Sequence, residues 1–191
     1  MMTPTLLEGP ASEPVSLADV KAHLRLTSSD EDGLLGKLIV AARLTVEAAS
    51  GCELIAQKWR IAFDRWPRDG VVRLPLRPVI ACDAVRVFTD AATSVTLAAS
   101  ALYIDAFASP PRLVLTTAPP DPGRSAGGIE VDLTVGFGVD AASVPPNLRQ
   151  AVTLLAARWF ERRGDDPLDG REAPLPPDVV ALVAPHRSPR I

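Results

Sequence analysis

Apolar residues recur at helical spacing in two stretches near the start of the chain. The first stretch predicts a short helix over about residues 16–25, beginning at Ser16, whose hydroxyl can accept a hydrogen bond from a first-turn amide. Asp19 suits the positive end of this helix dipole. The apolar positions of this helix are Leu17, Val20 and Leu24.

The second stretch predicts a long helix over about residues 30–50, ended by Gly51. Its wide apolar face consists of Leu34, Leu35, Leu38, Ile39, Ala42, Val46 and Ala49. Lys37, Arg43 and Glu47 fall outside this face, so we expect all three to point away from the core.

After Gly51 the apolar period changes from about 3.6 residues to 2, which is typical of half-buried strands. In "QKWRIAFDRW" Trp59, Ile61 and Phe63 alternate with charged residues. Further short strands are predicted in "VVRLP", "PVIACDAVRVF", "TSVTL", "LYID", "RLVLT" and "IEVDLTVGFG". Short strands at this spacing predict a small antiparallel sheet or sandwich rather than a βαβ unit.

The helical period returns after this segment and predicts a helix over about residues 147–163. Its stripe consists of Leu148, Val152, Leu155 and Trp159. We expect Leu155 and Trp159 to be buried against Leu38 and Ile39 of the long helix. A proline-rich segment and a short apolar stretch, Val179–Val183, follow. That stretch is too short to form a stable helix without a partner surface.

These elements predict an α+β fold. We expect a helical bundle core made by the helices at 16–25, 30–50 and 147–163, with an inserted antiparallel β domain and an extended C-terminal tail. The predicted organisation is an N-terminal arm and helical part at 1–55, the β domain at 56–140, a helix completing the bundle at 141–164, and a proline-rich tail with a short helix at 165–191.

Composition narrows the function classes. The 191 residues carry a net charge of −3, which gives no electrostatic argument for a nucleic-acid-binding module or for an anionic membrane surface. No apolar run reaches the roughly 20 residues of a membrane span, and the N-terminus lacks the pattern of a secretory signal. Cys52 and Cys82 share no metal or redox spacing, so we interpret them as reduced thiols of a cytoplasmic protein.

The sequence shows no recognisable catalytic constellation. His23 and His186 lie beside basic residues and away from clusters of possible ligands, so we expect no metal and no cofactor. Gly136 and Gly138 lack the context of a phosphate loop and are interpreted as a turn out of the sheet. An enzyme or small-molecule-binding β-sandwich protein remains the alternative. Its site would be lined by aspartates from different strands, namely Asp64, Asp83, Asp105 and Asp132.

The order of the motifs resembles one known family. "PVSLADVKAHLRL", "DEDGLLGKLIVAARLTVEAASG", "WRIAFDRWP", "LPLRPVIACDAVRVF", "IEVDLTVGFG", "VPPNLRQAVTLLAARWFERR" and "LPPDVVALVAPHR" follow one another as in the head–tail connector (adaptor) proteins of long-tailed bacteriophages and gene transfer agents. Each motif is weak alone, but seven in order are specific. The resemblance covers roughly Val15 to Arg187.

The resemblance implies a structural protein without enzymatic activity. It implies a ring, expected to be a dodecamer, that docks on the portal protein, joins stopper or tail proteins on the other side, and lets DNA pass without specific binding. Such a protein is expected at the head–tail junction of a particle assembled in the bacterial cytoplasm, with no membrane partner. The tail is expected to contact a partner through Val179, Val180, Leu182, Val183, Arg187 and Arg190.

Overall fold

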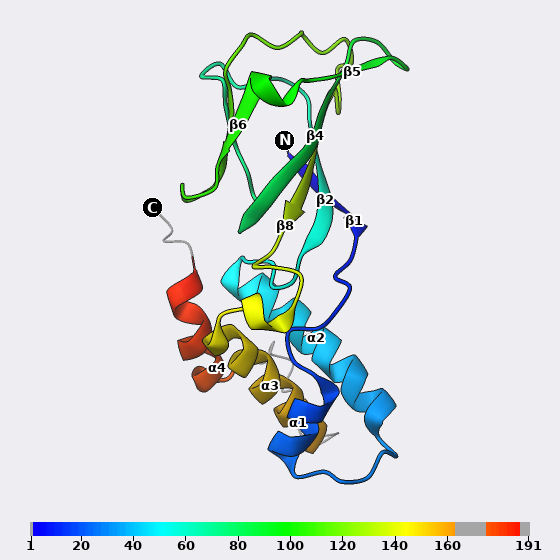
Figure 1. Cartoon of the computed structure of the whole chain (residues 1–191), viewed down its shortest axis with the longest axis vertical. Coiled ribbons are helices and arrows are strands. Elements are labelled where there is room, and N and C mark those ends of the chain that lie inside the picture. Colours follow the sequence, from blue (N-terminus) through cyan, green and yellow to red (C-terminus); the bar gives the residue numbers. More distant parts are fainter. Residues whose placement is uncertain (1, 163–174, 188–191) are drawn as a thin grey trace, which may run out of the picture. The chain divides into compact units, whose positions relative to one another are not determined.

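The computed structural model describes residues 2–162 and 175–187 (Figure 1). The chain divides into two compact units: Met1–Ala11 with Ala56–Phe137, and Ser12–Ile55 with Gly138–Ile191. The strands lie in the first unit, which we call the β unit, and the α-helices lie in the second, which we call the helical unit. The first unit contains β1 (Thr3–Glu8), β2 (Gln57–Phe63), β3 (Val71–Arg73), β4 (Val79–Phe88), β5 (Ser94–Thr96), β6 (Leu102–Asp105), β7 (Arg112–Leu115) and β8 (Ile129–Val135). The second contains α1 (Leu17–Leu24), α2 (Asp32–Ser50), α3 (Pro146–Glu161) and α4 (Pro177–Val183).

The strands of the first unit form two antiparallel sheets. One has five strands in the order β1-β2-β8-β4-β5, and the other has three in the order β3-β7-β6. The central strand β8 pairs with β2 from Gln57↔Val135 to Phe63↔Ile129. Residues 1–15 carry no clear periodicity, yet β1 adds to the edge beside β2. Pro4 fits that edge, because a proline lacks the amide donor that a central strand needs.

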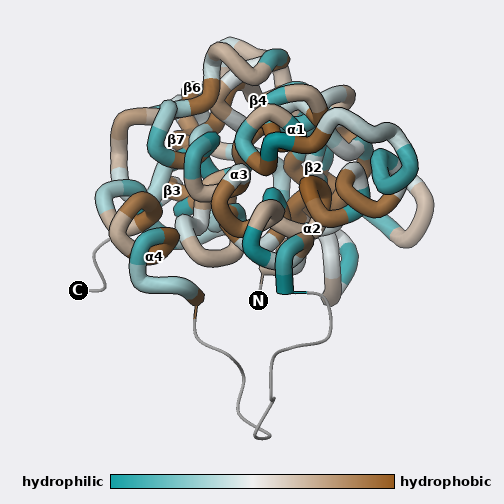
Figure 2. Tube along the Cα trace, turned by 90° about the horizontal axis from the view of Figure 1, so that it is seen from below, coloured by the Kyte–Doolittle hydropathy of each residue, from teal (hydrophilic) through white to brown (hydrophobic). Residues whose placement is uncertain are grey.

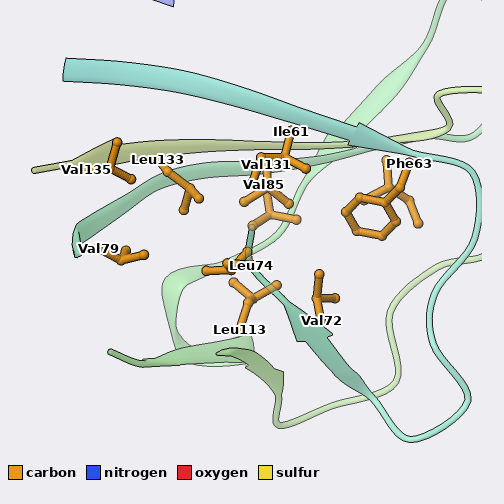
Figure 3. Close-up of a cluster of buried hydrophobic side chains, with 11 residues drawn as sticks. Ile61, Phe63, Val72, Leu74, Val79, Val85, Leu113, Val131, Leu133 and Val135 are labelled. Atoms are coloured by element: carbon orange, nitrogen blue, oxygen red, sulfur yellow. The ribbon is translucent and has the colours of Figure 1, made fainter. Parts of the chain in front are cut away.

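The predicted alternation of buried and polar residues is confirmed in β8. Ile129, Val131, Leu133 and Val135 are buried, while the residues between them are only half-buried. Figure 3 shows Val131, Leu133 and Val135 gathered with Ile61 and Phe63 of β2, and Ile129 belongs to the same cluster. The three-stranded sheet and its neighbouring loop cover them with Val72, Leu74 and Leu113.

The second unit is built around α3, which packs against α1, α2 and α4. The predicted start of α1 is confirmed: the Asp19 amide donates to the Ser16 hydroxyl at 3.0 Å. Gly51 ends α2 in the left-handed conformation with a φ of 69°, as a glycine at this position permits. Leu35, Ile39, Ala42 and Val46 form the buried side of α2.

The expectation of a single helical bundle core is wrong. In the described part of the chain, four helices and two antiparallel sheets occur, and the sheets enclose a hydrophobic core of their own. Within the predicted C-terminal tail, the short helix is present as α4 and packs on α3, while residues 165–174 and 188–191 lie outside the described part of the chain. Periodicity indicates which face of each element is apolar, but not which faces share a core.

Three side-chain expectations also need correction. Trp159 is half-buried, and the neighbouring Phe160 is the buried aromatic of α3, with 7% of its surface exposed. Leu38 is half-buried as well. Arg43 and Glu47 point into the unit rather than away from it.

Candidate interaction surface

The described residues contain no group of three or more His, Cys, Asp or Glu side chains that could hold a metal ion. His23 lies exposed on α1. His186 follows α4, and its Nε2 lies 3.0 Å from Oδ1 of Asn147 on α3. This histidine therefore helps to join two helices. Within the described ranges, no helix is long and apolar enough to cross a membrane.

The four aspartates of the alternative hypothesis are not gathered into one pocket. Asp64 accepts a hydrogen bond from the Gly127 amide at 2.8 Å, and Asp83 accepts one from the Thr134 hydroxyl at 2.8 Å. Asp105 forms an ion pair with Arg112. Asp64 lines a surface hollow of ≈ 460 Å³ beside Phe63 and Arg65, and the other three aspartates do not.

Asp132 belongs to a polar network on the outer face of the five-stranded sheet. Arg60 donates to it through Nε at 2.7 Å, and Arg86 on the opposite strand also donates to it. The same two guanidinium groups approach Glu130 at 3.3 and 3.5 Å. Burial by itself would raise the pKa of Asp132, but the hydrogen bonds and the positive charges of Arg60 and Arg86 together lower that pKa. These ion pairs join the three strands β2, β8 and β4, and their arrangement does not resemble a cofactor site.

A second charged cluster lies inside the helical unit, on α2. Arg43 donates through NH1 to Glu47 at 2.8 Å and through Nε to Glu13 at 2.9 Å. The other oxygen of Glu47 accepts the Leu54 amide at 3.0 Å. Arg43 and Glu47 are 5% and 7% exposed, so both ions are almost fully removed from water.

The carboxylates of this cluster are affected by burial. Desolvation raises the pKa of Glu47, although the Leu54 amide and Arg43 oppose the shift. Desolvation also raises the pKa of Glu53 to about 7, and the nearby charge of Glu47 acts in the same direction.

The opposite face of α2 is apolar although it faces solvent. Leu34, Val40 and Leu44 are 38%, 38% and 55% exposed. The other exposed residues of this helix, which the structure describes along its full length, are Gly33, Lys37 and Ala48. We call this set the α2 outer face, and it carries one charge, that of Lys37. The usual arrangement of a surface helix, with charges outside and apolar residues inside, is partly reversed here.

The residues expected to contact a partner lie on and after α4. Val179 and Val183 are buried within their own unit, while Val180 and Leu182 are half-buried. Arg187 is exposed, and its Nε donates to the Ala49 carbonyl at the end of α2 at 3.0 Å. Arg190 lies outside the described residues.

Sequence reasoning missed the α2 outer face because Arg43 and Glu47 were assigned to the surface. One signal was available. Arg43 and Glu47 stand four residues apart, where side chains on a helix can pair, and a paired set can be buried. Val40 and Leu44 are also four residues apart, on a different face.

Comparisons with known proteins agree with the motif order. A family model described as "Phage gp6-like head-tail connector protein" matches residues 14–87. A search of curated proteins gave no match.

Three solved structures are similar over almost the whole chain. A chain from the neck of an empty gene transfer agent (GTA) particle computed with C6 symmetry is 28% identical, with a TM-score of 0.82, covering 99% of this chain and 97% of that one. A chain from the virion of a native gene transfer agent particle is 27% identical, with a TM-score of 0.80 and the same coverage. A chain from the neck of a native GTA particle computed with C12 symmetry is 30% identical, with a TM-score of 0.77, covering 98% and 97%.

Proposed function

We propose that copies of this chain form a ring between the head and the tail of a phage-like particle. The premise is that the chain belongs to the phage head–tail connector family and is a structural connector. The observation that carries the proposal is the match over 99% of the chain to a protein of a particle neck. Both units of the chain fall within this match, so the β unit belongs to the connector as much as the helical unit does.

The proposed ring is a dodecamer docked on a portal protein, with stopper or tail proteins on its other side. Similar chains come from necks computed with C6 and C12 symmetry, which supports a ring of this kind. DNA passes through the ring without specific binding. The net charge of −3 supports this part of the proposal, because strong phosphate binding needs an excess of basic groups.

The proposed role is non-enzymatic and needs no cofactor. The ionisable side chains described above are used by internal hydrogen bonds and ion pairs, which supports a structural use of them. The location that follows is the head–tail junction, after assembly in the bacterial cytoplasm.

We also propose that α4 and the segment after it contact a partner such as the portal. Arg187 and Arg190 would supply positive charge to that contact, and Val180 and Leu182 would add partly exposed apolar surface. Val179 and Val183 would act indirectly, by fixing α4 on α3.

A deletion in the particle-producing cell tests the connector function. Without this chain, electron microscopy should show DNA-filled heads and separate tails, and the intact gene supplied on a plasmid should restore joined particles. Tailed particles in normal number without the chain would disprove the connector function. Arg187→Glu should also reduce joining, while thermal unfolding changes little because the hydrogen bond to Ala49 that is lost lies at the surface. Normal joining would remove Arg187 from the proposed contact.

A further inference from the structure

The large apolar side chains of the α2 outer face stay partly open to solvent among the residues that the structure describes. Leu35, Ile39, Ala42 and Val46 are buried on one side of α2, which packs mainly against α3, and Leu34, Val40 and Leu44 lie on the other side of the same helix. Exposed apolar side chains are common singly, but a row of them along one helix, flanked by Gly33 and Ala48 and interrupted by Lys37, is typical of an interface. Figure 2 shows hydrophobic residues recurring along α2.

The other side of the helical unit carries a different surface. α3 lies between α4 and the N-terminal half of α2 (Figures 1 and 2). Since α4 buries Val179 and Val183 against the unit, its remaining side faces outward. We call Pro177, Asp178 and Ala181 of α4, with Ala184 and Pro185 of the turn that follows it, the α4 outer face; Arg187 is also exposed but is bonded to Ala49.

The two outer faces differ in side-chain size and carry opposite charges. The α2 outer face offers large side chains at Leu34, Val40 and Leu44, whereas the α4 outer face offers small ones at Ala181 and Ala184. Small residues let a second helix approach closely and receive large side chains between them. Lys37 is the one charge of the first face and Asp178 that of the second.

We propose that the α2 outer face of one copy binds the α4 outer face of the next copy in the ring, with Lys37 beside Asp178 of the neighbouring copy. This inference rests on the proposed ring. A ring needs two different surfaces on opposite sides of each subunit, because head-to-tail contacts close into a circle, whereas one self-complementary patch gives only a dimer. The N-terminal half of α2 meets this requirement, because α3 separates it from α4, whereas the C-terminal ends of α2 and α4 touch each other.

The contact also accounts for the partly reversed polarity of α2. Two of the charged residues of α2, Arg43 and Glu47, pair with each other inside the unit. The outer face is therefore left with few charges, which is compatible with a buried interface. The core of an interface is depleted of charged residues, and each that remains needs a partner. Lys37 forms no ion pair with another described residue, and Asp178 of the neighbouring copy would supply that partner.

Charge exchange tests the pairing in particles. Lys37→Glu and Asp178→Lys should each lower the yield of tailed particles about ten-fold, because like charges then meet at every contact of the ring. The double variant Lys37→Glu with Asp178→Lys should restore the yield. Arg68→Glu, an exposed charge change in the β unit, serves as the control and should leave the yield unchanged.

Crosslinking tests the same contact without the Asp178→Lys substitution, which could itself disturb the fold of α4. Particles carrying Val40→Cys together with Ala181→Cys, treated with a short bismaleimide, should give a ladder of covalent multimers. Particles carrying Ala181→Cys alone should give monomers. Dimers from Val40→Cys alone would overturn the inference, because they would indicate pairing of α2 with α2.

The outcomes separate this inference from the proposed function. If both charge variants join heads to tails at the normal level, or if the double variant does not recover, the inference is wrong and the connector function stands. If tailed particles do not contain the chain at all, the proposed function itself fails.

Discussion

The guanidinium of Arg43 lies 2.8 Å from the carboxylate of Glu47, one turn further along α2, and both side chains are buried. Glu13 completes the pairing of Arg43, and the Leu54 amide completes that of Glu47. The pair therefore connects α2 to the segment before α1 and to the segment after α2.

Removing one member of this pair should destabilise the protein strongly. Glu47→Ala leaves the buried Arg43 charge with one partner and the Leu54 amide with none from Glu47, so the free energy of unfolding should fall by about 3–5 kcal/mol. Urea denaturation measures this change. The exposed pair Lys58–Glu8 is the matched control, and Glu8→Ala should cost at most about 1 kcal/mol.

Replacing both members by apolar residues should be much milder. Arg43→Met with Glu47→Leu removes both buried ions, and such replacements are often close to neutral, within about 1 kcal/mol of the starting stability. A loss as large as that of Glu47→Ala would show that the pair itself, and not the isolated ion, determines stability.

Stability should depend on pH through Glu53. Its pKa is raised from 4.5 to about 7 in the folded chain, mainly by burial. Between these two values the folded state holds a proton that the unfolded state has lost, so the free energy of unfolding falls as pH rises through this window and levels off above it. Since Glu53 keeps some contact with water, the expected fall is about 1–2 kcal/mol.

Glu53→Gln should flatten most of this dependence, leaving the smaller contribution of Glu47, whose pKa is raised in the same direction. Thermal unfolding followed at several pH values from 5 to 8 measures the profile. Asp30→Asn, an exposed change in the same unit, should keep the original slope. An unchanged slope in Glu53→Gln would assign the dependence to another group.

Phe160 should contribute more to stability than Trp159. Phe160 is buried, whereas Trp159 keeps part of its surface in water. Phe160→Ala should cost about 3–5 kcal/mol, the range for a large buried aromatic, and Trp159→Ala should cost clearly less. Urea denaturation of the two variants compares them directly, and equal losses would contradict the burial of α3 described here.

Gly123 should not tolerate a side chain. A Cβ atom at this position would lie 1.8 Å from the Thr89 carbonyl oxygen, which belongs to the backbone and cannot move aside cheaply. Gly123→Ala should therefore destabilise the β unit by about 2–4 kcal/mol. Gly9 in the same unit has nothing within 4 Å, so Gly9→Ala should change the melting temperature little. Similar melting temperatures for both variants would refute the close approach.

The sequence by itself determined the local elements. The helical stripes predicted α1, α2 and α3 closely, because each stripe depends only on residue spacing along the chain and not on which surface the helix packs against. Alternation predicted the buried face of β8 for the same reason. The order of these elements also indicated the connector family, which the comparisons support.

Tertiary structure alone decided which apolar faces share a core. Sheet pairing joined β1 to β2 across some fifty residues, and it gave the strands a core separate from that of the helices. Which side of α2 faces the core could also not be predicted from a local sequence pattern. Arg43 is buried because Glu13 and Glu47 meet it there, and Glu13 arrives from a different segment. A charge can enter a core only where partners converge, and that convergence is a property of the folded chain.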